Sequence, residues 1–242
     1  MFYDCTEIRI VITGITGGIA KATTQLLSSL GAEVIVTARS HEKLEESLVD
    51  LTGNVSGQVM DLTDEESIKA FFEKTGNFDH LVTTASSSML APLKEMNFKA
   101  AKELIATKLW GQMLCVYHSL PYLSKAGSVT LFSGTVTQKP IAGASMFAAT
   151  GAATEAAGRI WAYELAPIRV NSIVPGIIDT RLWEDITGNK DAAQAQLDNI
   201  AKILPVQRVG RPEEIAKAVA FLIDNGFVNG TSLVVDGGHR LV

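Results

Sequence analysis

The stretch Glu7–Leu30, EIRIVITGITGGIAKATTQLLSSL, decides the fold of this chain. It begins with a short run of apolar residues, Ile8, Ile10, Val11 and Ile12, which is too short and too rich in β-branched residues for a helix. A glycine-rich turn, Thr13 to Ala20, follows, and apolar and small residues then recur at helical spacing. Glycines permit a tight turn, and a helix N-terminus presents free N–H groups to an anion. This strand–turn–helix unit therefore predicts a site for a diphosphate.

The composition predicts a single α/β domain over residues 1–242. The chain has 242 residues, of which 47% are hydrophobic and 19% charged, and this suits a large buried core. The formal net charge of -5 argues against nucleic acid as the main partner. No apolar run is long enough for a membrane span, the start MFYDCTEIR does not resemble a signal peptide, and two cysteines are too few for a disulfide framework. We therefore expect a cytoplasmic protein with no membrane partner and, since no Cys/His spacing indicates one, no metal site.

Short apolar runs alternate with helical patterns along the rest of the chain. This alternation predicts a doubly wound parallel sheet, a Rossmann fold, of about seven strands with helices on both faces. Two long helices are expected at residues 97–123 and 145–165, and the polar, helical stretch 180–204 is expected to be a mobile substrate lid. The predicted strands lie at residues 8–12, 33–38, 55–60, 78–85, 128–133, 169–174 and 231–235.

The end of the second predicted strand bears on the choice of dinucleotide. A fold that binds NAD usually has an Asp or Glu about 20 residues after the glycine turn, where it holds the ribose 2′-hydroxyl. Ala38 stands there instead and Arg39-Ser40 follow, so the sequence favours NADP(H) over NAD(H), because arginine suits a 2′-phosphate. The alternative is an exposed arginine at a strand end. Asp61-Leu62 and Thr84-Ala85-Ser86 would lie at the carboxyl ends of later strands, where ligands bind in such sheets.

Over essentially its whole length the chain resembles the short-chain dehydrogenase/reductase family. Residues 13–19, TGITGGI, are similar to the family's T-G-x-x-x-G-I-G, with Ala20 in place of the last glycine. Residues 79–86, DHLVTTAS, stand where the family has D-x-L-V-N-N-A-G, and residues 169–176, RVNSIVPG, are close to R-V-N-x-I-x-P-G. Two further family signatures are matched by RVGRPEEIA at 208–216 and VDGG at 235–238.

The resemblance implies an oxidoreductase with a dinucleotide site, a small organic substrate, and assembly into homodimers or homotetramers through helices 97–123 and 145–165. It implies that the glycine turn holds the pyrophosphate and that the residues after Pro175-Gly176 contact the nicotinamide carboxamide. The residues expected to bind the cofactor are Gly14, Thr16, Gly17, Gly18, Ile19, Arg39, Ser40, Asp61, Leu62, Thr84, Ala85, Ser86, Pro175, Gly176, Ile178 and Thr180.

The family's catalytic tetrad of Asn, Ser, Tyr and Lys is missing from this chain. No register shift restores a Y-x-x-x-K motif, because residues 123–162 contain no tyrosine and residues 140–189 contain no lysine. Phenylalanine cannot donate a proton and glycine cannot hold a ribose, so ordinary carbonyl reduction should lose acid–base help worth about 100- to 10,000-fold. Threading residue by residue places Lys108, Gly134, Phe147 and Gly151 at the four tetrad positions.

We interpret the sequence as an NADP(H)-binding short-chain oxidoreductase with a rewired active site and an unidentified small organic substrate. Hydride transfer belongs to the cofactor, so an iminium or an activated alkene, which needs no acid at the tyrosine position, remains a suitable substrate. Lys108 is expected to serve the ribose or the proton path, with Ser133 or Thr135 near the substrate. The alternative for Lys108 is a solvated helix residue or an interface ion-pair partner. The alternatives for the protein are a non-catalytic dinucleotide-binding sensor or structural subunit, and a non-redox enzyme that reuses the pocket.

Overall fold

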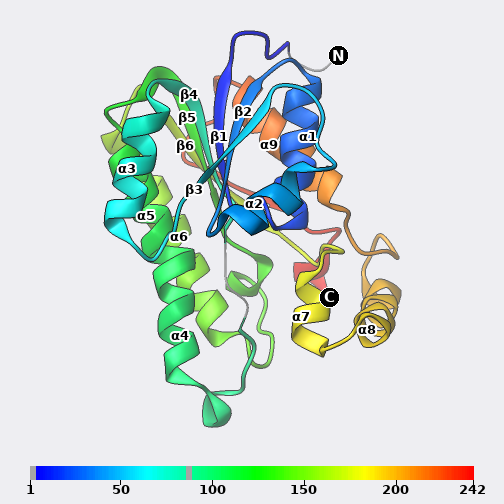
Figure 1. Cartoon of the computed structure of the whole chain (residues 1–242). Helices are drawn as coiled ribbons and strands as arrows, with labels where there is room; N and C mark the ends of the chain where they lie inside the picture. Colours follow the sequence, from blue (N-terminus) through cyan, green and yellow to red (C-terminus); the bar gives the residue numbers. More distant parts are fainter. Residues whose placement is uncertain (1–3, 86–88) are drawn as a thin grey trace.

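The computed structural model describes residues 4–85 and 89–242, and it contains one seven-stranded parallel sheet (Figure 1). The strand order is β3-β2-β1-β4-β5-β6-β7, and each neighbouring pair is parallel. The chain winds outward in opposite directions from β1 and β4, so the carboxyl edge between them is a topological switch point, where ligands bind in such sheets. The strands are β1 (Arg9–Thr13), β2 (Glu33–Ala38), β3 (Val55–Val59), β4 (Phe78–Thr83), β5 (Leu123–Phe132), β6 (Arg169–Pro175) and β7 (Ser232–Val235).

Helices cover both faces of this sheet, so the predicted doubly wound fold is confirmed (Figure 1). One face carries α1 (Gly18–Ser29), α2 (His41–Leu48) and α9 (Pro212–Asp224), and the other carries α3 (Glu65–Thr75), α5 (Gly111–Ser119) and α6 (Ser145–Glu164).

The two hydrophobic cores follow from the two-residue period of the strands. Ile10 and Ile12 in β1 belong to the core under α1 and α9, whereas Val11 between them belongs to the core under α3 and α5. The same alternation places Ile35 of β2 in the core under α3 and α5, while its neighbours Val34 and Val36 are in the core under α1 and α9. Both sides of each central strand are therefore buried, which explains why these strands read as continuous apolar runs.

The helix predicted at residues 97–123 is correct at its start and wrong at its end. The Asn97 side chain accepts hydrogen bonds from two backbone N–H groups of the first turn, as an N-cap should. The helical segment comprises α4 (Phe98–Leu104), a π-helical turn (Ile105–Trp110) and α5, and it ends at Ser119. Pro121 has no N–H with which to continue a helix, and β5 already begins at Leu123 rather than at Ser128.

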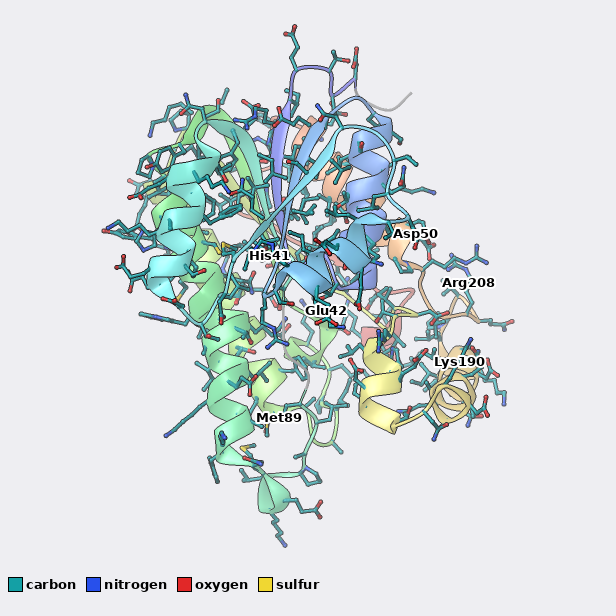
Figure 2. All side chains as sticks on the ribbon, in the orientation of Figure 1. His41, Glu42, Asp50, Met89, Lys190 and Arg208 are labelled. Carbon is teal, nitrogen blue, oxygen red and sulfur yellow. The ribbon has the colours of Figure 1, made fainter. Side chains whose placement is uncertain are left out.

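Helical segments also extend beyond the carboxyl end of the sheet. The stretch predicted as helical at 180–204 forms α7 (Leu182–Thr187) and α8 (Lys190–Ile203), separated by Gly188 in a left-handed conformation with φ of 85°. A small separate core of Trp183, Ala193 and Leu197 holds α7 against α8. Figure 2 labels Met89, which precedes α4, and Lys190, which begins α8, on opposite sides of this end of the molecule. Within the described ranges, no helix has the length and apolar character required to cross a membrane.

The contact between β4 and β5 depends on Gly127, because a Cβ atom there would lie 1.9 Å from the carbonyl oxygen of Asp79. Gly127→Ala must therefore push the two strands apart, and we expect the free energy of unfolding to fall by at least about 2 kcal/mol in urea denaturation. Gly226→Ala is the matched control, since no heavy atom lies within 4 Å of its Cβ position. Its effect should stay within about 0.5 kcal/mol, and equal effects of the two substitutions would contradict this account.

Candidate functional site

A cleft of about 880 Å³ lies at the carboxyl ends of the central strands. This volume is in the range of sites for small molecules and cofactors. Its walls bring together residues of β2, β5 and β6 with residues of the turns that follow β1 and β4, all far apart in the sequence. Of the residues predicted to bind a cofactor, those that line the cleft are Gly14, Thr16, Gly17, Gly18, Ile19, Arg39, Asp61, Leu62, Thr84, Ala85, Pro175, Gly176, Ile178 and Thr180.

The glycine turn allows β1 and β4 to approach each other at the cleft floor. Gly14 has a φ of 76°, and a Cβ atom there would lie 2.6 Å from the Cβ of Ala85, so only glycine fits. Gly17 is the N-cap of α1 and has no side chain to cover the N–H groups of the first turn. The turn therefore presents backbone N–H groups and the positive end of α1 to the cleft, an arrangement suited to phosphate oxygens.

One predicted cofactor residue within the described ranges does not line the cleft. Ser40 is not among the lining residues, because its hydroxyl caps α2 by accepting the N–H of Lys43 at 3.3 Å. Ser86 lies outside the described residues. Lys43, which was not predicted, lines the cleft together with Arg39. Its position on the first turn after the Arg39-Ser40 pair was the available signal.

Lys108 lies on the cleft wall within the π-helical turn, and its side chain is buried, with 7% of the residue exposed. Its Nζ is 3.4 Å from the carbonyl oxygen of Ser133 and 5.9 Å from the centre of the Phe147 ring. Burial lowers the pKa of Lys108 to about 8. Among the described residues no carboxylate oxygen lies within 4 Å of this nitrogen. The interpretation of Lys108 as a solvated helix residue is therefore wrong.

Ser133 also lines the cleft, but its hydroxyl is bound to a buried carboxylate. Ser133 Oγ donates a hydrogen bond of 2.6 Å to Oε1 of Glu155, and Thr137 Oγ1 donates to the same oxygen at 2.8 Å. Glu155 is only 8% exposed, on the face of α6 that points toward the end of β5. Glu155 could not be singled out from the sequence, because a single glutamate among alanines is typical of the exposed face of a helix.

A side chain at Gly151 would force its neighbours to move. A Cβ atom there would lie 2.8 Å from Ser133 Oγ and 2.9 Å from Thr137 Cγ2. Both atoms belong to residues that are held by Glu155. The space beside Gly151 is therefore filled by tightly packed neighbouring side chains.

Thr135 and His239 form a second buried polar pair at the cleft. Thr135 lines the cleft, and its Oγ1 is 3.0 Å from Nδ1 of His239, which is 5% exposed. Burial, followed by the nearby charge of Lys139, lowers the pKa of His239 below its ordinary value. The imidazole is therefore neutral at pH 7 and exchanges a hydrogen bond with the threonine hydroxyl.

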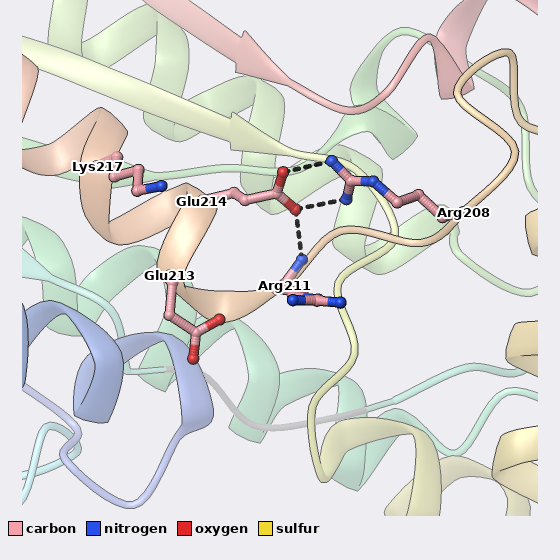
Figure 3. A pocket seen from close by; sticks show the side chains of 5 residues that line it. All are labelled: Arg208, Arg211, Glu213, Glu214 and Lys217. Atoms are coloured by element: carbon pink, nitrogen blue, oxygen red, sulfur yellow. Dashed lines mark hydrogen bonds and ion pairs between the residues drawn. The ribbon is translucent and has the colours of Figure 1, made fainter.

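A smaller pocket of about 380 Å³ lies at the start of α9, lined by Arg208, Arg211, Glu213, Glu214 and Lys217 (Figure 3). Arg208 donates hydrogen bonds of 2.8 and 2.6 Å to the two oxygens of Glu214, and the backbone N–H of Arg211 donates to Glu214 at 2.8 Å. The hydrogen bonds from Arg208 and then from Arg211 lower the pKa of Glu214 to about 2. These groups satisfy one another, so the RVGRPEEIA segment has a structural explanation here.

Comparison with known proteins agrees with this architecture. A family model described as "Enoyl-(Acyl carrier protein) reductase" matches residues 14–240. The chain belongs to the short-chain dehydrogenase/reductase family. It is 34% identical to cis-4-hydroxycyclohexanecarboxylate dehydrogenase of Sinomonas cyclohexanicum, with 96% of each chain covered. It is 33% identical to a 3-oxoacyl-[acyl-carrier-protein] reductase of Thermotoga maritima, with 94% of this chain and 96% of the relative covered.

Solved structures of the family have the same fold over almost the whole chain. A small-chain dehydrogenase in complex with NADPH has a TM-score of 0.84 and 33% identity, covering 97% of this chain and 99% of its own. A short-chain dehydrogenase/reductase from Brucella melitensis has a TM-score of 0.89 and 27% identity, with 99% of each chain covered. Members of this family are oxidoreductases that bind nicotinamide dinucleotides and act on small molecules.

The lowered pKa of Lys108 implies that the free energy of unfolding depends on pH. Because the folded-state value is about 8 and the ordinary value 10.5, protonated Lys108 should destabilise the fold by about 3 kcal/mol below pH 8. Between pH 8 and 10.5 the unfolded chain still holds this proton and the folded chain does not, so this cost disappears as the pH rises. We expect Lys108→Met to unfold at higher urea than the wild type at pH 7, and this advantage to vanish by pH 10.5.

The control is Lys69→Met, because Lys69 is exposed on α3. Its stability relative to the wild type should not change over the same pH range. If the difference in stability between Lys108→Met and the wild type stays constant from pH 7 to 10.5, the Lys108 ammonium is not destabilised by burial and this account is wrong.

Proposed function

We propose that this protein is an NADP(H)-dependent oxidoreductase that transfers a hydride to or from a small organic substrate in a rewired active site. The observation that carries the proposal is the cleft itself. It combines the glycine turn and the wall from Pro175 to Thr180 with the buried amine of Lys108, which stands at the family's asparagine position.

The charge at the end of β2 supports NADP(H) over NAD(H). Arg39 and Lys43 both line the cleft, and Ala38 stands where a carboxylate would repel a 2′-phosphate. Arginine and lysine together match the charge of a phosphate monoester and provide several N–H donors. A solved relative with 33% identity is described as a complex with NADPH, which agrees with this assignment.

The residues around Lys108 support the chemical role. The bound nicotinamide would supply or accept the hydride. With a pKa of about 8, Lys108 exists in both protonation states near neutral pH, so its amine is suited to move a proton at the substrate or to hold the ribose. Phe147 and other apolar residues line the cleft beside this amine. Such a site favours an iminium or an activated alkene, whose reduction needs no tyrosine acid.

We further propose that residues 180–204 form the substrate lid. Leu182, Trp183 and Ile186 of α7 line the cleft, and the indole N–H of Trp183 donates to the carbonyl of Ile178 at 3.0 Å. This hydrogen bond links the proposed lid to the wall that would face the nicotinamide. The apolar side chains of α7 favour a substrate with a hydrophobic body.

A homodimer or homotetramer is proposed through the helical segment at residues 98–119 and through α6. Large apolar side chains are exposed on both elements, which is unfavourable for an isolated chain. The most exposed of them are Phe98, Trp110, Tyr117, Ile160 and Tyr163, each more than half exposed.

The second candidate function is a dinucleotide-binding sensor or structural subunit without turnover. The packing of Ser133, Thr137 and Glu155 around Gly151 favours it, because this packing leaves no room for the family's lysine. Both functions require cofactor binding, and they differ only in hydride transfer.

Calorimetric titration with NADPH, NADP⁺ and NADH tests the cofactor assignment. We expect NADPH to bind more tightly than NADH, and Arg39→Ala and Lys43→Ala each to weaken NADPH binding by about tenfold, the loss of one charged phosphate contact. Neither substitution should change NADH affinity more than about twofold. Lys69→Ala, an exposed lysine on α3, is the control. Absence of binding by any dinucleotide would refute both candidate functions.

The decay of NADPH absorbance against carbonyls, imines and activated alkenes tests turnover. We expect imines or activated alkenes to be reduced and Lys108→Met to lower kcat by about 100-fold, the usual size of a proton-transfer contribution. Unchanged cofactor affinity and unchanged turnover in Lys108→Met would remove Lys108 from the mechanism. NADPH binding without reduction of any compound would leave the sensor as the better account.

A further inference from the structure

The surroundings of Lys108 favour an uncharged amine. The nitrogen lies on the cleft wall, its residue is 7% exposed, and its hydrogen-bond contact is the 3.4 Å approach to the Ser133 carbonyl. In the part of the chain that the structure describes, no acidic group is within ion-pair distance of it. A buried ammonium without a counter-charge is costly, whereas the neutral amine has a free electron pair and a smaller desolvation cost.

The cleft next to this amine has room for a reacting group. A Cβ atom built at Gly134 would meet nothing closer than Val136 Cγ2 at 4.0 Å, so the position of the family's serine is open space. Apolar side chains surround the cleft on the other sides, namely Leu90, Ile141, Phe147, Leu182 and Ile186. A compound with a polar carbonyl and a hydrophobic body fits these walls.

We propose that Lys108 is a nucleophilic amine that condenses with aldehydes and ketones in the cleft to form an imine. This inference goes beyond the proposed hydride transfer, because it assigns covalent chemistry to the protein alone. The cleft would then bind carbonyl compounds and convert their C=O group to a C=N bond on Lys108, as in enzymes that use a Schiff-base lysine.

The reaction balances without any further reactant. The electron pair of Lys108 Nζ attacks the carbonyl carbon, a C–N bond forms, and a proton moves from nitrogen to the former carbonyl oxygen. The resulting carbinolamine loses a second proton from nitrogen and its hydroxyl group as water, which leaves a C=N bond. One amine and one carbonyl compound thus give one imine and one water, and nothing is oxidised or reduced.

Burial gives Lys108 an advantage over the exposed lysines of this chain. At pH 7.5 roughly a quarter of an amine with a pKa of about 8 is neutral, whereas only about one part in a thousand is neutral at the ordinary value of 10.5. The lower basicity offsets part of this difference, because nucleophilicity falls as pKa falls. A rate advantage of at least about tenfold should remain.

The test is reductive labelling of the wild-type protein at pH 7.5 with benzaldehyde and sodium cyanoborohydride, in the absence of nucleotide. Peptide mass spectrometry then follows the benzyl group on each lysine. We expect Lys108 to be labelled at least about tenfold faster than exposed Lys69, with a pH–rate midpoint near 8. Labelling of Lys108 at or below the rate of Lys69 in the folded protein would overturn the proposal.

Two controls show whether the reaction depends on the folded site. Lys108→Arg retains a cation but has no amine, so its peptide should carry no benzyl group while Lys69 is labelled as before. Unfolding the wild type in urea should remove the advantage of Lys108, because the burial is lost. An advantage that survives unfolding would show that the fold does not activate this amine, and it too would overturn the proposal.

The labelling experiment and the dinucleotide titration test the two proposals separately. Fast labelling of Lys108 in a protein that binds no dinucleotide would refute the proposed oxidoreductase and support the amine site. Tight NADPH binding with slow labelling would support the cofactor site and refute the amine.

Discussion

The close approach of the turn after β1 to the end of β4 is the contact on which the cleft depends. Gly14 lies so near Ala85 that any side chain at residue 14 would overlap it. This approach brings the first turn of α1 to the switch point of the sheet, where backbone N–H groups face the cleft. The walls contributed by β2, β5 and β6 are then placed by the parallel pairing of the strands, because their carboxyl ends share one edge.

Beside the cleft, Ser133, Thr137, Gly151 and Glu155 form one packed unit. Glu155 holds the hydroxyl groups of Ser133 and Thr137, and these two residues occupy the space beside Gly151. The Ser133 carbonyl in turn approaches Lys108. A change at any one of these positions would therefore disturb the others, and the effects of substitutions here should not be additive.

Most of the fold could be predicted from the sequence, because buried parallel strands and capped helices leave local patterns. Asn97 capped its helix as expected, and the strand boundaries shifted by few residues, except for β5. The start of β5 was missed because Leu123 to Gly127 has no apolar alternation and gains its pairing from β4. The burial of Lys108, the partnership of Glu155 and the placement of Lys43 depend on contacts between distant elements, which no local pattern records.

The ion pair between Arg208 and Glu214 has a consequence for the shape of the cleft in acid. Gly210, which lies between the two arginines held by Glu214, donates its N–H to the carbonyl of Ile177 and accepts the N–H of Asp179. The Ile177–Ile178 wall is thereby fastened to α9 through a carboxylate whose pKa is about 2. This brace stays ionised at pH values where ordinary carboxylates take up protons, so this wall should keep its attachment to α9 in mild acid.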